Sequence, residues 1–244
     1  RKSRIGFTLL ATSTSLPEIA VAFFAAMSGE AAISIGNLLG ANIANVCLIM
    51  GLSLILYSFK TGLKKLVAVR FKPEELDLWY FGIFTASIIP ILLISFLPAS
   101  KIVGLILISI YAYYTFQIIS KRELPLEESD EIIKAKNYRR NNLTVYTILA
   151  LLGIIGVIAS ADFLVNSTAE IALIVGIPSL LIPATIIAVG TTFPELSLNI
   201  QATLRGHVDL AFGNVIGSCF TNITLILGVT LILSPVRFNI RVFS

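Results

Sequence analysis

Two glutamates stand deep inside apolar stretches of this 244-residue chain, each directly after a proline. Glu18 ends the run Thr14-Ser-Leu-Pro-Glu18, and Glu195 ends the run Thr191-Thr-Phe-Pro-Glu195. An ionised side chain at the centre of a membrane helix costs at least ~2.5–3.5 kcal/mol on insertion scales, so it faces a cavity or a partner. Neither stretch contains a Lys or Arg that could neutralise its glutamate. We therefore expect the pair to bind cations, with helix-locking hydrogen bonds as the alternative role.

Both glutamates lie in two copies of one sequence, and adding 177 to a position in the first copy gives its partner in the second. Between Gly6 and Gly51, 14 of 46 positions are identical. They include Thr-x-x-Pro-Glu and Gly-Asn-x-x-Gly, which unrelated apolar helices would not share at one offset. The first half (1–120) holds a repeat at about 6–51, residues 121–142 form a loop, and the second half (143–244) holds a repeat at about 183–228.

The composition is that of an integral membrane protein. Charged residues make up 13% of the chain, against roughly 25% in soluble domains, and hydrophobic residues make up 56%. About 20 apolar residues in a helix cross a bilayer core, where the backbone must form its hydrogen bonds internally. The sequence therefore predicts an all-α membrane protein. Seven stretches qualify as spans: about 5–27, 31–58, 77–97, 101–120, 144–173, 179–204 and 208–233.

The positive charges orient these spans. Of the 18 Lys and Arg, 15 fall on one side of the membrane: before the first span, in the loops 60–76 and 121–142, and at Arg205. The positive-inside rule places that side in the cytoplasm. The two repeats then cross the membrane in opposite directions, which is the inverted-topology architecture of secondary transporters with a midplane binding site.

The offset of 177 also predicts that the complete protein is longer than this chain. The repeat partner of the 144–173 span would precede residue 1, and the partners of the spans 77–97 and 101–120 would follow residue 244. The complete protein would then have ten spans.

The residues around the glutamates offer oxygen ligands. Pro17 and Pro194 lack an amide hydrogen and clash with the carbonyls of Ser13 and Gly190, which breaks or kinks a helix. Unwound carbonyls beside a carboxylate form cation sites in transporters, whereas a plain kink is the alternative.

Two asparagines add amide oxygens. Asn45 and Asn222 occupy matching positions after Gly-Asn-x-x-Gly, where each needs a partner, either a bound cation or another helix. Calcium takes six to eight such hard oxygen ligands, and the lack of thiolate or imidazole in the set disfavours zinc and copper. Two carboxylates neutralise one divalent or about two monovalent cations, so competition for the same oxygens is a basis for exchange.

At these motifs the chain resembles the calcium/cation antiporter superfamily, specifically the sodium/calcium exchangers of prokaryotic type. Thr-Ser-Leu-Pro-Glu18 with Gly-Asn-Leu-Leu-Gly40, and Thr-Thr-Phe-Pro-Glu195 with Gly-Asn-Val-Ile-Gly217, are similar to the family's two alpha repeats. The resemblance implies a ten-helix fold, a prokaryotic plasma membrane, and a gate formed by the 144–173 helix with a helix upstream of residue 1.

The resemblance also implies the ion ligands. Calcium would bind to Glu18, Glu195 and the carbonyls of Thr14 and Thr191. The implied flanking sodium sites draw on the carbonyls of Ala11 and Ala188, the hydroxyls of Ser15 and Thr192, Asn45 and Ser218.

The chain departs from the family pattern at two positions. Many sodium/calcium exchangers have an aspartate where this chain has Asn222, and a serine where it has Ala41. The centre therefore has two carboxylates, which leaves the sodium stoichiometry and any proton role open. Proton/calcium exchangers typically carry a glutamate after Gly-Asn, where this chain has Gly40 and Gly217, and this favours sodium as the counter-ion.

We therefore predict a secondary active antiporter, not an enzyme, that exchanges calcium for sodium by alternating access. A proton/calcium antiporter is the alternative, and a cation channel or a non-transporting scaffold ranks lower. The expected partners are calcium, sodium (or protons) and the lipid bilayer. The sequence predicts no cofactor, no nucleic-acid binding and no protein partner.

Overall fold

The computed structural model describes residues 10–62, 101–120, 143–178 and 180–235, together with eight positions between 77 and 89. Every element formed by these residues is a helix, as the composition predicts. Four of the helices are long and apolar enough to cross a membrane: 31–61, 101–118, 147–175 and 208–233. The predicted span at 77–97 and the predicted loops 60–76 and 121–142 lie largely or wholly outside the described residues. At the start of the first loop, Lys60 and Thr61 form the end of a helix, and Gly62 follows it.

From α2 in the first repeat and α11 in the second, the two repeats and the helices that continue them form corresponding elements. The first contains α2 (Ala11–Thr14), α3 (Leu16–Met27), α4 (Ala31–Ile43), the π-helix η2 (Ala44–Met50) and α5 (Gly51–Thr61). The second contains η3 (Pro183–Ile187), α11 (Ala188–Thr191), α12 (Phe193–Leu204), α13 (Val208–Thr221), η4 (Asn222–Ile226) and α14 (Leu227–Leu233). Adding 177 to the bounds of α2 and α3 gives the bounds of α11 and α12, so the sequence repeat is also a structural repeat.

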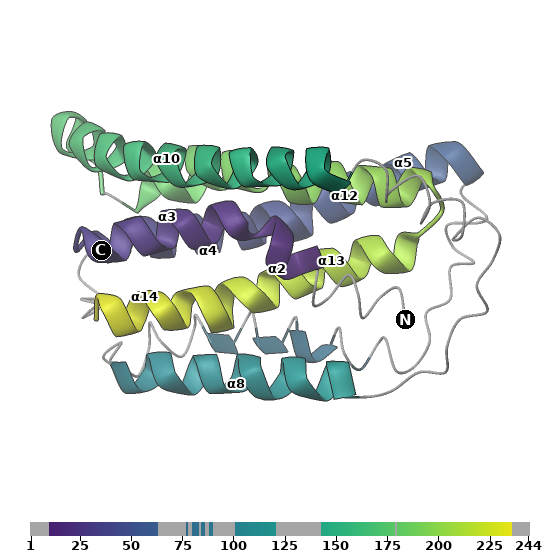
Figure 1. Ribbon diagram of the computed structural model, residues 1–244, viewed down its shortest axis with the longest axis horizontal. Helices are drawn as coiled ribbons and strands as arrows, with labels where there is room; N and C mark the ends of the chain where they lie inside the picture. Colours follow the sequence, from purple (N-terminus) through teal and green to yellow (C-terminus); the bar gives the residue numbers. More distant parts are fainter. Residues whose placement is uncertain are drawn as a thin grey trace.

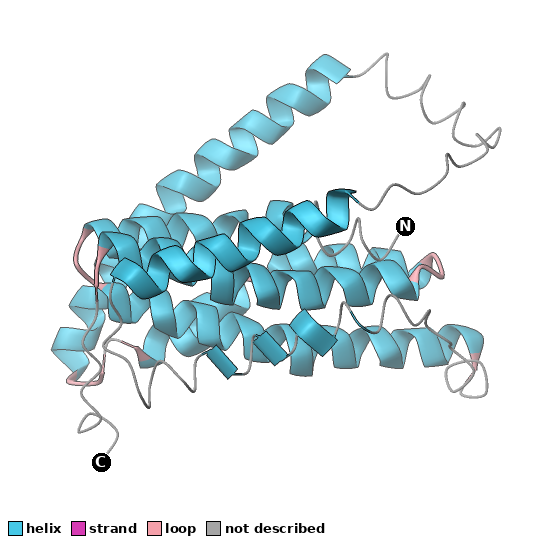
Figure 2. Ribbon diagram, turned by 90° about the horizontal axis from the view of Figure 1, so that it is seen from below, coloured by secondary structure: helices cyan, strands magenta, loops and turns pink. Residues whose placement is uncertain are grey.

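Two long helices flank the repeats. Figure 1 shows α8 (Lys101–Ser120) alongside α14, and α10 (Leu143–Val175) on the opposite side of the bundle, alongside α3. Between them, one apolar cluster joins α3, α4, η4 and α14 through residues such as Ala22, Leu38, Ile223 and Leu227. The first part of α10 points away from the bundle at an angle (Figure 2). Most side chains of α10 are exposed, as in a helix that faces lipid.

The predicted spans 5–27 and 179–204 are not single helices. Each is interrupted just before its Pro-Glu pair, at Ser15 (ψ 14°) and at Thr192 (ψ 4°), whereas helical residues have ψ near −42°. Pro17 and Pro194 then lie in the first turn of the next helix, where a missing amide hydrogen costs nothing. The predicted interruption at both prolines is therefore confirmed. It is short, because the Ser15 amide still donates to the carbonyl of Ala11 at 3.0 Å.

Matching glycines end α3 and α12. Gly29 (φ 78°) and Gly206 (φ 81°) adopt the left-handed conformation that glycine reaches at little cost. In both turns the glycine amide and the next amide donate back to carbonyls in the last turn, a Schellman arrangement. The chain therefore reverses in the same way in both repeats, which places α4 beside α3 and α13 beside α12.

Another glycine allows the two repeats to touch. Helix α4 packs against η3 of the other repeat. A Cβ added at Gly40 would collide with the carbonyl oxygen of Ala184 and would lie 2.7 Å from the Cβ of Ala188. Small residues that allow such close approach are typical of helix packing in membranes, where dispersion contacts drive association.

Candidate cation-binding site

The two glutamates occupy equivalent positions at the centre of the bundle. Glu18 lies in the first turn of α3 and Glu195 in the first turn of α12, immediately after the two helix interruptions. Both side chains are 0% exposed. A carboxylate in the first turn is stabilised by the helix dipole, which the interruptions create in mid-span. The sequence repeat thus places two acidic side chains at two helix N-termini inside the bundle.

A hydrogen bond links Glu195 to the interruption in the other repeat. The hydroxyl of Ser15 donates to Glu195 Oε1 at 3.0 Å, and the hydroxyl of Ser218 reaches the same oxygen at 3.5 Å. Ser15 precedes Glu18 by only three residues, so the two acidic turns face each other. The structure therefore brings together the predicted residues of both repeats, which are 177 positions apart in sequence.

A pair of equivalent hydrogen bonds relates the repeats by pseudo-two-fold symmetry. The Thr14 hydroxyl lies 3.5 Å from Asn214 Oδ1, and the Thr191 hydroxyl donates to Asn37 Oδ1 at 3.2 Å. The two contacts are equivalent, because Thr191 is the repeat partner of Thr14 and Asn214 is the repeat partner of Asn37. Asn37 and Asn214 are the asparagines of Gly-Asn-x-x-Gly and were missing from the predicted site residues, although their identity in the repeat could have indicated them.

The carbonyls of Ala11 and Ala188 lie at the same interruptions. Each accepts the backbone amide four residues later and is 3.2 Å from the hydroxyl of Thr14 or Thr191. A carbonyl oxygen has two lone pairs, so these hydroxyls and a cation would compete for the second one. Both predicted carbonyl ligands therefore lie at the helix interruptions and are partly occupied in this conformation.

Most of the acidic oxygen atoms have no hydrogen-bond partner. Among the described residues, both carboxylate oxygens of Glu18 and Oε2 of Glu195 are buried and unpartnered. No Lys, Arg or His side chain is buried among the described residues. A buried charge without a partner is strongly unfavourable, and a bound cation would remove that cost. The arrangement is therefore chemically suited to hold a cation between the two helix N-termini.

The two predicted asparagines lie in matching π-helical segments. Asn45 is the second residue of η2, and Asn222 is the first residue of η4. Both are almost completely buried, and neither side-chain oxygen has a hydrogen-bond partner among the described residues. π-helical turns are uncommon and often occur at functional sites. The sequence predicted that the two amides occupy equivalent positions in the repeats, but it did not indicate the π-helical backbone.

A further asparagine marks the symmetry axis. The repeat partner of Asn42 is Cys219, and the two residues contact each other reciprocally. Asn42 Nδ2 lies 3.5 Å from the Cys219 carbonyl oxygen, and Cys219 Sγ lies 4.0 Å from the Asn42 carbonyl oxygen. Asn42 Oδ1 also accepts a hydrogen bond of 3.0 Å from Asn222 Nδ2. Asn42 is not identical between the repeats, so the repeat could not single it out.

The two halves of the site differ in their hydroxyl groups. Thr192, the partner of Ser15, donates to the carbonyl of Val189 at 3.1 Å and not to Glu18. The position equivalent to Ser218 is Ala41, which has no hydroxyl. Glu18 therefore lacks both hydroxyl donors that contact Glu195, and a ligand has freer access to its oxygens.

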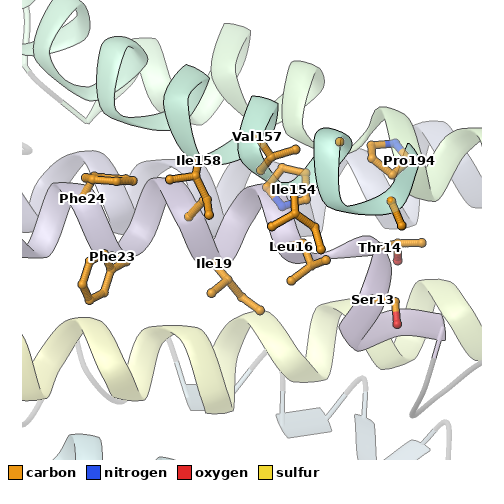
Figure 3. A pocket seen from close by; sticks show the side chains of 14 residues that line it. Ser13, Thr14, Leu16, Ile19, Phe23, Phe24, Ile154, Val157, Ile158 and Pro194 are labelled. Atoms are coloured by element: carbon orange, nitrogen blue, oxygen red, sulfur yellow. The ribbon is translucent and has the colours of Figure 1, made fainter. Parts of the chain in front are cut away.

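An apolar cleft of about 660 Å³ lies beside the site, between α3 and the first part of α10. Figure 3 shows Leu16 and Ile19 facing Ile154 and Val157 across it, with Thr14 and Pro194 at one end. Its lining is almost entirely apolar, so it is not itself a cation site. It does, however, separate the carboxylate-bearing turns from α10.

Known proteins place the chain in a family. The family model described as "Sodium/calcium exchanger protein" matches residues 1–119 and 145–244. The chain belongs to the sodium/calcium exchanger family. It is 31% identical to the sodium/calcium exchanger MaX1 of Methanosarcina acetivorans, over 95% of this chain and 73% of that protein. It is also 31% identical to an uncharacterized membrane protein of Methanocaldococcus jannaschii, over 90% of this chain and 67% of the relative.

Solved structures show that the family fold is also shared. One structure of the sodium-calcium exchanger NCX_Mj, soaked with sodium and strontium ions, matches with a TM-score of 0.68 and 25% sequence identity. The match covers 99% of this chain and 74% of NCX_Mj. As a member of the sodium/calcium exchanger family, this chain is a calcium/cation antiporter of the membrane, and its inverted repeat is the core of the exchanger fold.

Proposed function

We propose that this exchanger moves calcium in one direction and sodium in the other, with both ions bound between Glu18 and Glu195. The observation that carries the proposal is the set of three unpartnered, fully buried carboxylate oxygens at two facing helix N-termini. Two negative charges match one calcium ion or about two sodium ions. The carbonyls of Thr14 and Thr191 and the amide oxygens of Asn45 and Asn222 would complete a ligand set of hard oxygens, which calcium prefers.

The buried charge explains why the two fluxes are coupled. An empty site leaves two carboxylates uncompensated inside the membrane, which makes a conformational change through the occluded state costly. Either cargo removes this cost when it binds. The carrier therefore switches between its two open states when it is loaded, and rarely when it is empty, so that calcium movement requires a counter-ion.

Close packing at Gly40 supports sodium rather than protons as the counter-ion. The position after Gly-Asn where proton/calcium exchangers typically carry a glutamate is here packed against the backbone of Ala184. A glutamate could not fit there without separating α4 from η3. A third carboxylate that could carry a proton is therefore excluded at this position, and Asn222 also provides none.

The cleft beside α3 supports α10 as the moving element. Most of the large side chains described in the first part of α10 are exposed, whereas its second part packs through Ala161 and Val165 against Val21 and Ala25. A helix that is anchored at one end and separated by a cleft at the other can tilt at low cost. Its tilt would open and close the approach to the interruption at Ser15.

Calcium uptake into vesicles tests the counter-ion directly. The purified protein is reconstituted, and uptake is measured under an outward sodium gradient and, separately, under an imposed pH gradient. We expect the sodium gradient to drive uptake and the pH gradient alone to drive none. Uptake that follows only the pH gradient would reject sodium as the counter-ion, and flux that needs no counter-ion would indicate a channel.

A further inference from the structure

The buried face of α12 is polar well beyond the glutamate. Glu195, Asn199 and Thr203 follow one another at intervals of four residues and therefore lie on one face of the helix. All three are at most 1% exposed. The remaining buried residue of this fully described helix is Ala202. Such a face is costly inside a membrane unless its polar groups have partners or contact water.

A helix packed against α12 also contributes a buried polar group. Helix α5 packs against α12, and Ser53 is the one buried residue of α5, all of which the structure describes. The hydroxyls of Ser53 and Thr203 and Oδ1 of Asn199 have no hydrogen-bond partner within the described residues. Asn199 Nδ2 donates to the Glu195 carbonyl at 2.7 Å, so its amide joins the row to the carboxylate-bearing turn.

The equivalent interface in the first repeat contains no row of unpartnered polar groups among its described residues. The partners of Asn199 and Thr203 are Ala22 and Ala26, and Ala22 belongs to an apolar cluster that includes Leu227 and Leu231 of α14. The partner of Ser53 is Thr230, whose hydroxyl lies 2.7 Å from that of Ser34 and 3.0 Å from the Ile226 carbonyl. The polar row is therefore not required by the fold, because the same fold is built without it in the other half.

The row leads from the site to one end of the bundle. Thr203 lies about 12 Å along the helix from Glu195, at 1.5 Å per residue. One residue later, the carbonyl of Leu204 accepts a hydrogen bond from Lys60 Nζ at the end of α5. This end carries the turn at Arg205, which the distribution of Lys and Arg assigns to the cytoplasm. The unpartnered hydroxyl and amide groups thus span the interval between the carboxylates and that membrane face.

We propose that Asn199, Thr203 and Ser53 line the path by which hydrated cations pass between the two carboxylates and the face that carries Arg205. The proposal rests on the proposed transport function and adds the route and its side. Buried water needs two to four polar partners, and the unpartnered groups provide them. The path is closed in this structure, since its lining is fully buried, and opens when α5 and α12 separate.

Cysteine accessibility tests the path with a matched control from the other repeat. Thr203→Cys and Ala26→Cys are each made in a Cys47→Ser background, because Cys47 is exposed, and the background protein gives the blank. A membrane-impermeant thiosulfonate reagent is applied to each face of sealed vesicles, and Arg205→Cys identifies the face at which α12 ends. We expect Thr203→Cys to react from the Arg205 face at least tenfold faster than Ala26→Cys reacts from the opposite face.

The outcomes separate this proposal from the transport function. Equal rates for the two variants, or reaction of Thr203→Cys only from the face opposite Arg205→Cys, would overturn the path. Labelling does not require calcium flux, so a positive result in a protein that fails the uptake assay would support the path and reject the exchange. As a second variant, Thr203→Val should lower the transport rate several-fold without changing calcium affinity, and an unchanged rate would count against the path.

Discussion

Glu18 and Glu195 have equivalent positions but different hydrogen bonds. Glu195 accepts from the hydroxyls of Ser15 and Ser218, whereas both oxygens of Glu18 are unpartnered within the described residues. Charge-assisted hydrogen bonds of this kind stabilise a carboxylate by more than neutral ones do. Hydrogen bonds thus hold Glu195 in place before a cation binds, whereas the negative charge of Glu18 depends more on the cation for its stabilisation.

Replacing either glutamate with glutamine should weaken calcium binding while preserving the shape of the site. Glu18→Gln and Glu195→Gln each remove one of the two negative charges, and we expect at least a tenfold loss of affinity, about 1.4 kcal/mol, by calorimetry in detergent. Glu170→Gln on an exposed face of α10 is the control and should bind as the parent does. Parent-like affinity in either site variant would contradict the assigned role.

At the scale of elements, the contact between α4 and η3 holds the two repeats together. Gly40→Ala should lower stability by about 1–3 kcal/mol, because the new methyl group collides with backbone atoms of Ala184 that cannot move independently. Gly51→Ala is the matched control, since a Cβ there meets no atom within 4 Å, and helix propensity favours alanine by about 1 kcal/mol. Thermal unfolding in detergent compares the two, and equal midpoints would contradict the packing.

The sequence predicted the elements that carry the site because identical residues recur at one offset. Pro17 and Pro194 indicated the interruptions, and Glu18 and Glu195 indicated the centre. Other features of the site depend on how the helices pack, and the sequence contains no local motif that predicts them. The contacts of Asn37 with Thr191 and of Asn42 with Cys219 join different repeats, and the π-helical turns arise from backbone geometry that the residue types do not encode.

At the scale of the whole molecule, α10 should move relative to the bundle while α8 does not. Helices α8 and α14 approach closely at Gly104 and Gly228, whereas a cleft separates α3 from the first part of α10. The distance between spin labels at the exposed positions Leu151 on α10 and Phe23 on α3 should therefore differ between the sodium-bound and the calcium-bound protein.

The control pair for this measurement lies on the tightly packed helices. Labels at Ile102 on α8 and Leu233 on α14, which are both exposed, should keep one distance distribution in either ion. If the α10 pair stays fixed while the control pair moves, α10 is not the moving element.

Anomalous diffraction from crystals soaked in calcium or strontium shows whether the two buried glutamates share one calcium ion. We expect a single strong peak between Glu18 and Glu195, about 2.3–2.6 Å from oxygens of both carboxylates. The peak should disappear in Glu18→Gln crystals soaked in the same way. A peak only at another position, or an empty site at saturating calcium, would show that the two glutamates do not share a calcium ion.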